Sequence, residues 1–189
     1  MGMPLLHTDW TAAQAIALPD DDNRYEVLDG ELVMTPPPSW AHQVAVEQFY
    51  LLLQAYVREH ALGWVKLSPS TVVLSERRLV QPDVFVVPRG EGAAPRDWSD
   101  ITALLLAVEV LSPSTARRDR WQKRHMYQAF GASEYWIIDP NARLVERWRP
   151  GDERPEVCSD TLTWAPAGSR ALLSIDLTQL FAVVAGECE

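Results

Sequence analysis

The spacing of apolar residues near the N-terminus predicts a β-hairpin followed by a long helix. Apolar and polar residues alternate through RYEVLDGELVM (24–34) on both sides of Asp29-Gly30, a dipeptide typical of a two-residue turn with positive φ. Counting outward from this turn places Glu26 and Glu31 on one face of the hairpin and mostly apolar side chains on the other. Apolar residues at helical spacing then predict a helix over about 40–58.

The rest of the chain predicts a sheet of strands with further helices. Residues 104–111, LLLAVEVL, contain one polar residue, Glu109, and predict a strand buried on both faces. A helix over about 115–130, entered through Ser114 or Thr115, follows it. Further strands are predicted at 64–68, 71–75, 83–88, 134–139 and 143–148, and a last helix at about 176–184. This order predicts one α/β domain over residues 1–189, with a mixed central β-sheet flanked by helices and the hairpin as an N-terminal extension.

Composition narrows the class of protein. A chain of 189 residues that is 47% hydrophobic can bury one globular core, and no apolar run approaches the roughly 20 residues of a membrane span. The N-terminus lacks the basic and apolar regions of a secretory signal, and Cys158 and Cys188 lack the spacing of metal ligands. We therefore expect a reduced, cytoplasmic protein without a membrane partner.

The charge is acidic overall but uneven. A net charge of −9 counts against a protein that coats nucleic acid non-specifically. Residues 117–125, RRDRWQKRH, carry five Lys or Arg and one Asp, a net charge of +4, so with a total of −9 the other residues carry −13. A basic segment on an acidic protein fits an anionic ligand, and it also fits a solvated helix face.

Two acidic residues stand at strand ends in apolar surroundings. Asp83 follows Pro82 and opens the strand at 83–88, and Glu109 lies near the end of the strand at 104–111. A buried ionised carboxylate needs a cation, hydrogen bonds or a metal ion to offset its desolvation. Each residue also has a simpler interpretation, Asp83 as a turn residue and Glu109 as a member of a structural ion pair.

Lys123 is the third candidate. Asp119, Lys123 and Tyr127 follow one another at a spacing of four residues, so they line one side of the predicted helix. The N-terminus of that helix comes just after the Glu109 strand, and a helix N-terminus favours anions. Lys123 can lean back towards the strand end, although a lone lysine in a basic helix is more often exposed.

Two carboxylates and a lysine suit hydrolysis of a phosphodiester. Hard oxygen ligands fit Mg²⁺ or Mn²⁺, which keep waters and bind phosphate oxygens. Such a metal lowers the pKa of bound water and offsets phosphate charge, and a nearby lysine orients the water and neutralises developing charge.

Six sequence elements in this order resemble a single family. YEVLDGELVM, PPPSWAH, QPDVFVV, VEVLSPST, the pattern D-x-x-x-K-x-x-x-Y and EYWIIDP together resemble the Uma-two family of restriction-endonuclease-like proteins, in the PD-(D/E)xK nuclease superfamily. The resemblance runs from about Trp10 to Pro140 and implies a restriction-endonuclease-like fold with a nuclease core at about 40–140. It also implies an Mg²⁺-dependent endonuclease in which Asp83, Glu109 and the backbone carbonyl of Val110 bind the metal.

The chain departs from the superfamily pattern at one position. The superfamily lysine usually lies two residues after the glutamate, where this chain has Leu111. The D-x-x-x-K pattern makes Lys123, one element later, the expected replacement in catalysis. Glu31 is a further candidate ligand, whereas we expect Glu47 to face solvent and His42 to have a local structural role.

The leading hypothesis is a metal-dependent endonuclease that cuts DNA. The arginines of the basic segment, Arg117, Arg118, Arg120 and Arg124, would contact the DNA backbone. A homodimer fits, because two sites cut both strands of a duplex most easily. The alternative is a non-catalytic nucleic-acid-binding or assembly module that keeps the fold, which the acidic bulk and Leu111 favour. A metal-dependent hydrolase of a small phosphorylated molecule is the third hypothesis.

Overall fold

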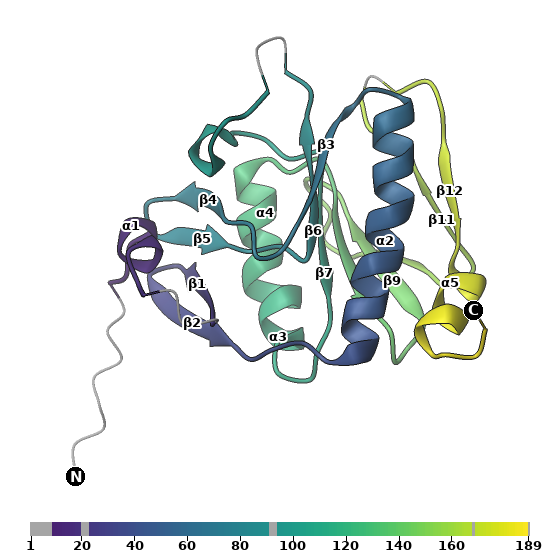
Figure 1. The fold of residues 1–189 in the computed structure, drawn as a ribbon, viewed down its shortest axis with the longest axis horizontal. Helices are drawn as coiled ribbons and strands as arrows, with labels where there is room; N and C mark the ends of the chain where they lie inside the picture. Colours follow the sequence, from purple (N-terminus) through teal and green to yellow (C-terminus); the bar gives the residue numbers. More distant parts are fainter. Residues whose placement is uncertain (1–8, 20–22, 91–93, 168, 189) are drawn as a thin grey trace.

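A six-stranded mixed sheet forms the centre of the protein (Figure 1). The computed structural model describes residues 9–19, 23–90, 94–167 and 169–188. The strands lie in the order β10 (Glu156–Cys158), β9 (Leu144–Trp148), β8 (Tyr135–Asp139), β7 (Leu106–Val110), β6 (Val84–Pro88) and β3 (Gly63–Leu67). β7 and β8 are parallel because a helical connection joins them, and the other neighbours are antiparallel.

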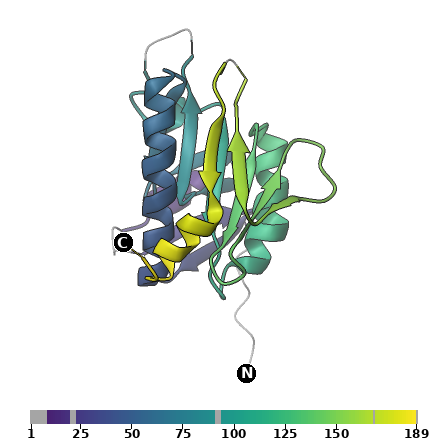
Figure 2. The same cartoon turned by 90° about the vertical axis from the view of Figure 1, so that its right-hand side faces the viewer.

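Helices cover both faces of this sheet, as Figure 2 shows. α2 (Trp40–Glu59) and α5 (Leu177–Val184) pack on one face, where Phe49 and Leu53 join a large apolar core with the hairpin β11 (Thr161–Trp164) and β12 (Leu173–Asp176). On the other face Met126 and Tyr127 of α4 (Arg124–Phe130) join a second core. The prediction of a mixed α/β fold with helices on both faces of the sheet is confirmed.

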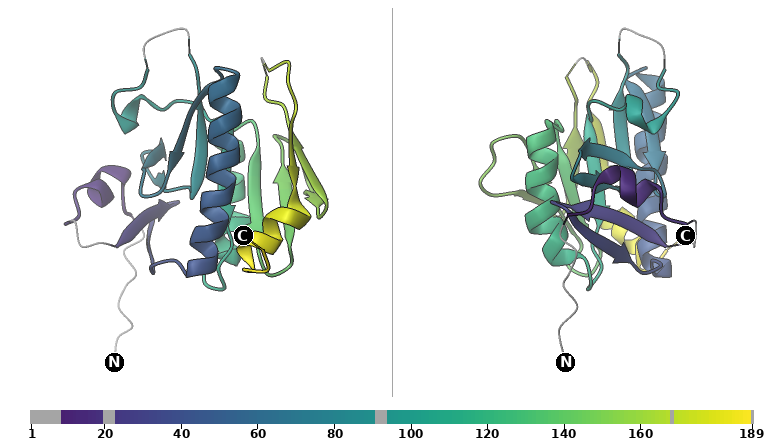
Figure 3. Two further views of the ribbon diagram at one scale, coloured as in Figure 1. Left: turned by 45° about the vertical axis from the view of Figure 1, so that its right-hand side comes forward. Right: turned by 90° about the vertical axis from the view of Figure 1, so that its left-hand side faces the viewer.

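The predicted hairpin belongs to a second sheet of four strands. Its order is β2 (Glu31–Thr35), β1 (Arg24–Leu28), β5 (Arg78–Val80) and β4 (Val72–Ser75), and the sequence pattern did not predict β5. Asp29 and Gly30 have φ of 53° and 88°, and Val27 pairs with Leu32, which confirms the two-residue turn and its register. Figure 3 (right) shows this hairpin in front of the main sheet, between α2 and α4.

Each face of the hairpin is covered in part, although apolar and polar residues alternate along it. α1 (Ala12–Ile16) covers one face, where Ala12 and Ala15 pack on Val27 and Leu79. The other face carries Glu26, which is 2% exposed, together with Leu28 and Val33 of the second core. Arg24 and Glu26, which share this face, are therefore held towards the interior of the molecule.

The predicted helix over 115–130 forms as three consecutive segments. Thr115 precedes α3 (Ala116–Arg118), a π-helical turn spans Asp119–Lys123, and α4 ends at Gly131, whose φ is 83°. A 3₁₀ turn, Trp98–Asp100, lies in the loop before β7.

No helix in the described part of the chain is long and apolar enough to cross a membrane. Residues 1–8, on which the predicted absence of a secretory signal depends, lie outside the described residues.

Candidate active site

Asp83 and Glu109 lie opposite each other at one end of the central sheet. β6 and β7 pair with Val84 opposite Val108, so the next residues along the pairing, Asp83 and Glu109, face each other. Both are buried, with 3% and 2% of their surface exposed. The peptide N–H of Val110 donates a 2.8 Å hydrogen bond to Asp83 Oδ2. The structure thus brings together the two carboxylates that the sequence placed at strand ends.

Lys123 reaches this pair from the helix that follows β7. Its Nζ atom lies 3.0 Å from Glu109 Oε1, and the Tyr127 hydroxyl donates a 2.9 Å hydrogen bond to the same oxygen. Asp119 Oδ1 lies 3.6 Å from Lys123 Nζ. The π-helical turn holds both Asp119 and Lys123 buried, and such turns occur frequently at functional sites. Lys123 therefore supplies an ammonium group that Leu111 cannot.

Glu26 also belongs to this cluster of buried charged side chains, although the sequence did not identify it as a site residue. Its Oε1 atom lies 2.9 Å from Lys123 Nζ and accepts a 2.8 Å hydrogen bond from the peptide N–H of Gln81. Glu31, the predicted further ligand, pairs with Leu28 at the turn end of the hairpin. No described residue forms an ion pair with Glu31, so Glu26 takes the place expected for it. The sequence did contain one signal for Glu26, because the alternation places Glu26 and Glu31 on the same face of the hairpin.

Arg24 is the second unexpected member, and it bridges the acids. Its Nη1 atom lies 2.8 Å from Asp83 Oδ1, and its Nη2 atom lies 3.7 Å from Glu109 Oε2 and 3.8 Å from Glu26 Oε1. The guanidinium also donates to the carbonyl of Gln81. Burial disfavours the charged form, but the surrounding carboxylates outweigh it and raise the pKa of Arg24 above its ordinary value.

His42 contacts Asp83 from the first turn of α2. Its Nε2 atom lies 3.3 Å from Asp83 Oδ2, and its Nδ1 atom is buried without a hydrogen-bond partner among the described residues. Burial alone would raise the pKa of Asp83. The hydrogen bond with His42, the charge of Arg24 and the Val110 N–H together lower that pKa below its ordinary value. His42 therefore belongs to the site, whereas Glu47 on the same helix is exposed as expected.

The pKa of Glu109 moves in the opposite direction. Burial and the nearby carboxylates of Asp83, Asp119 and Glu26 outweigh the favourable charge of Lys123, and they raise the pKa of Glu109 to about 8. The pKa of Lys123 is raised as well, because three carboxylates stabilise its charge more than burial disfavours it. Two opposed carboxylates with widely separated pKa values are typical of functional sites.

The cluster has an excess of negative charge. Four buried carboxylates, those of Glu26, Asp83, Glu109 and Asp119, face two permanent cations, so the cluster carries two excess negative charges once all four are ionised, and the proton that Glu109 holds below about pH 8 removes one of them. Asp119 Oδ1 is buried without a hydrogen-bond partner in the described structure. A divalent cation matches both this charge excess and the all-oxygen donor set.

The described residues contain no ready-made metal cage. No three His, Cys, Asp or Glu side chains among them are arranged to hold a metal ion by themselves. Mg²⁺ does not need such a cage, because proteins usually bind it through one or two carboxylates, with waters and phosphate oxygens completing the shell. Asp83 and Glu109 fit this mode. The N–H of Val110 donates to Asp83, which keeps Val110 beside the pair, and the carbonyl oxygen of Val110 takes no part in this hydrogen bond.

The predicted backbone-contacting arginines divide into two groups. Arg120 lies 2.7 Å from Glu146 Oε1 and 3.1 Å from Asp139 Oδ2, and Arg124 stacks 4.4 Å above the ring of Trp148. These two side chains have partners within the molecule, and their contact with the DNA backbone stays a prediction. Arg117 and Arg118 form no ion pair with any described residue.

A comparison with known protein families identifies the family of this chain. Residues 12–178, which include every member of the cluster, match the Uma2 family, whose description is "Putative restriction endonuclease". The chain belongs to the Uma2 family. The matched range extends beyond Pro140, where the resemblance in the sequence becomes weaker, to α5 at the end of the fold.

A solved structure shares the Uma2 fold. The crystal structure of a "putative nuclease belonging to DUF820" from Anabaena variabilis aligns with a TM-score of 0.77, over 93% of this chain and 99% of that one, with 22% sequence identity. The restriction-endonuclease-like fold is thereby confirmed. No curated protein matches the sequence of this chain significantly. Family and fold together support a nuclease-like function.

Proposed function

We propose that this Uma2 protein is a metal-dependent endonuclease of the PD-(D/E)xK type that hydrolyses phosphodiester bonds in DNA. The proposal depends on one observation: Lys123 Nζ lies 3.0 Å from a glutamate that faces Asp83 across β6 and β7. This arrangement supports a superfamily-like acid pair and lysine even though Leu111 stands at the usual lysine position. Asp83 and Glu109, with the Val110 carbonyl, would hold Mg²⁺ or Mn²⁺. A homodimer would allow two such sites to cut both strands.

In the proposed reaction a water molecule attacks phosphorus, and the P–O bond to the leaving oxygen in line with it breaks. The attacking water loses a proton to solvent, and the leaving oxygen takes one up. When bound, the divalent cation offsets phosphate charge and lowers the pKa of bound water. The raised pKa of Lys123 keeps its ammonium protonated, so Lys123 orients the water and stabilises developing negative charge, and does not accept a proton. Arg117 and Arg118, which have no intramolecular ion pair with described residues, contact the DNA backbone.

Plasmid cleavage tests this proposal. Wild-type protein should nick supercoiled DNA with Mg²⁺ or Mn²⁺ and not with EDTA. Asp83→Asn and Glu109→Gln should abolish nicking, and Lys123→Met should slow it about 10²- to 10³-fold, the usual loss for a group that stabilises transition-state charge. Glu47→Gln, an exposed acid on α2, is the matched control and should cleave like wild type. Undiminished cleavage by Asp83→Asn or Glu109→Gln, with a native circular-dichroism spectrum, would reject the proposal.

A second function is favoured by Arg24. Its guanidinium occupies the space between Asp83 and Glu109, so the acids are already neutralised in part without a metal. This arrangement supports a non-catalytic nucleic-acid-binding or assembly module. Such a module would bind DNA in a salt-dependent manner and show no metal-dependent turnover in the same plasmid assay.

A further inference from the structure

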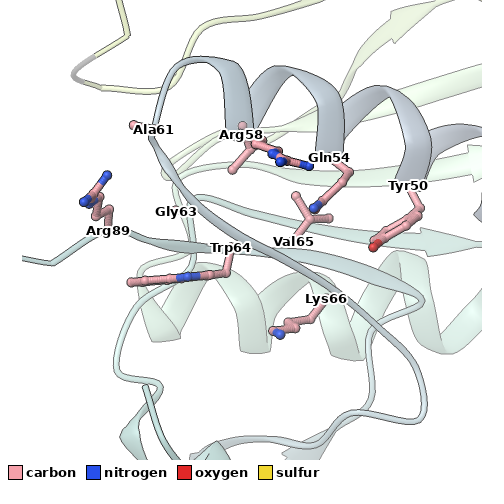
Figure 4. Close-up of a pocket in the computed structure, with 10 residues that line it drawn as sticks. Tyr50, Gln54, Arg58, Ala61, Gly63, Trp64, Val65, Lys66 and Arg89 are labelled. Carbon is pink, nitrogen blue, oxygen red and sulfur yellow. The ribbon is translucent and has the colours of Figure 1, made fainter. Parts of the chain in front are cut away.

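A pocket of about 470 Å³ opens along the outer edge of β3, the terminal strand of the central sheet. Figure 4 shows that Tyr50, Gln54 and Arg58 of α2 lie on one side of this strand, with Trp64 and Lys66 on the other. Arg89, just after β6, stands at the far end. This volume lies in the range of pockets that hold small ligands or parts of polymers.

The charge of this pocket differs from that of the molecule as a whole. Three cations line it, and none of the acidic residues that the structure describes does, although the chain carries a net charge of −9. Arg58, Lys66 and Arg89 form no ion pair with any residue that the structure describes. Most other basic side chains are paired with carboxylates, among them Arg24, Arg78, Arg120, Lys123, Arg143, Arg147 and Arg149. Three unpaired cations around one pocket indicate an anionic ligand.

The backbone of β3 adds hydrogen-bond donors to these charges. The Arg89 N–H donates to the Leu62 carbonyl, and the Ser68 N–H donates to the Asp83 carbonyl, so the even-numbered residues of this segment bond to β6. In an antiparallel pair, residues alternate between bonding to the partner strand and pointing away from it. The N–H and C=O groups of Gly63 and Val65 therefore point away from β6, towards the pocket. Backbone N–H groups and arginines are the usual contacts of phosphate oxygens, and aromatic rings stack on bases.

We propose that this pocket, the β3-edge pocket, holds the phosphodiester backbone of the nucleic-acid strand at a distance from the reacting phosphorus. The inference rests on the proposed nuclease function for the identity of its ligand. Arg58, Lys66 and Arg89 neutralise phosphates, and Trp64 or Tyr50 lies against a base or sugar.

The position of the β3-edge pocket agrees with a strand that continues from the candidate active site. β3 ends at Leu67, and the next residue, Ser68, bonds to the backbone of Asp83 at 3.2 Å. At about 3.4 Å per residue, Lys66 is about 7 Å and Gly63 about 17 Å along β3 from Ser68. A nucleic-acid backbone that follows this edge away from the acid pair would therefore pass through the β3-edge pocket.

Fluorescence anisotropy with a labelled single-stranded oligonucleotide tests the inference, in EDTA so that binding is measured without metal-dependent cleavage. The triple variant Arg58→Ala/Lys66→Ala/Arg89→Ala should bind roughly tenfold or more weakly than wild type, with a salt-dependence slope smaller by about 2, from about 0.7 per lost phosphate contact. Arg154→Ala removes an exposed cation at the opposite edge of the sheet and should bind like wild type. Circular dichroism checks that the triple variant is folded.

The outcomes separate this inference from the proposed function. Loss of binding in the folded triple variant supports the inference, whether or not wild type cleaves DNA. Failure of wild type to cleave DNA would reject only the proposed nuclease function. Equal binding by wild type and the triple variant overturns the inference even where wild type cleaves, and so does absence of binding by wild type at low salt. A nucleoside monophosphate that binds the pocket more tightly than the oligonucleotide also overturns it, because the pocket would then serve a free nucleotide.

Discussion

Lys123 Nζ lies 3.0 Å from Glu109 Oε1, although 14 residues and a change from strand to helix separate the two. A lysine two residues after Glu109 would project from the same face of β7, and Leu111 stands there instead. The π-helical turn delivers the ammonium group from the neighbouring layer of the fold. The same pair of charges is therefore assembled from two elements, a strand and a helical turn.

Lys123→Met should destabilise the protein by about 3–5 kcal/mol, the usual result of removing one partner from a buried ion pair. The change leaves Glu26, Glu109 and Asp119 buried without the ammonium that now contacts all three. Urea unfolding at neutral pH measures the effect, and Lys66→Met, at an exposed lysine, is the control. Equal unfolding free energies for the two variants would show that Lys123 does not compensate these acids.

Stability should depend on the protonation of Glu109. Because the pKa of Glu109 is raised from 4.5 to about 8, the folded protein holds a proton between these pH values that the unfolded chain has released. By linkage, the free energy of unfolding falls as pH rises through this window. Urea unfolding in EDTA across the window should show this slope in wild type and a smaller slope in Glu109→Gln, whose amide mimics the protonated acid. Identical slopes would contradict the raised pKa.

Arg24→Gln should lower the unfolding free energy of the metal-free protein and raise its affinity for a divalent cation. The guanidinium contacts Asp83 and lies near Glu109 and Glu26, so its loss costs about 3–5 kcal/mol without metal and makes the site more negative. Thermal unfolding with and without Mn²⁺ should show a larger stabilisation by Mn²⁺ in the variant. Arg78→Gln, which breaks a more exposed pair with Asp29, is the control and should change stability by about 0–1 kcal/mol. A smaller stabilisation by Mn²⁺ in Arg24→Gln would indicate that Arg24 supports metal binding.

Tyr127→Phe should alter the pH dependence of DNA cleavage. The Tyr127 hydroxyl donates to Glu109, and a hydrogen bond to a carboxylate favours its ionised form, so the variant should move the acidic limb of the pH–rate profile to higher pH. Tyr135→Phe removes a similarly buried hydroxyl, one that donates to the carbonyl of Asp119, and should leave that limb in place. Both variants should lose about 1 kcal/mol of stability. Equal pH profiles would limit Tyr127 to a packing role.

Asp83 and Glu109 could be placed at strand ends from local patterns, whereas the expectation that Lys123 joins them came from the D-x-x-x-K pattern of the family. An apolar run interrupted by one carboxylate defines a strand end, and a spacing of four residues defines one side of a helix. These rules placed Asp119, Lys123 and Tyr127 together, and all three are buried at the site. Spacing along the chain is sufficient here because the side of a helix or strand on which a residue lies depends only on its position within that element.

Arg24, Glu26 and His42 could not be assigned in this way. Alternation shows which hairpin residues share a face, but both faces of this hairpin are covered, one by α1 and the other by the main body. Which face meets the acid pair depends on packing between segments far apart in the sequence, as the contact of Arg24 with Asp83 shows. The ion pairs of Arg120 depend in the same way on β8 and β9, which follow it in the chain.

A metal-dependent nuclease of this type needs a divalent-cation site at the acid pair Asp83–Glu109. Calorimetric titration of Mn²⁺ into wild type and Glu109→Gln, near neutral pH and in two buffers of different ionisation enthalpy, tests this requirement most directly. We predict binding to wild type with release of up to one proton, because the metal displaces the proton that the raised pKa holds on Glu109, and loss of binding in the variant. Equal binding to both proteins, or no binding to wild type even with DNA present, would contradict the account.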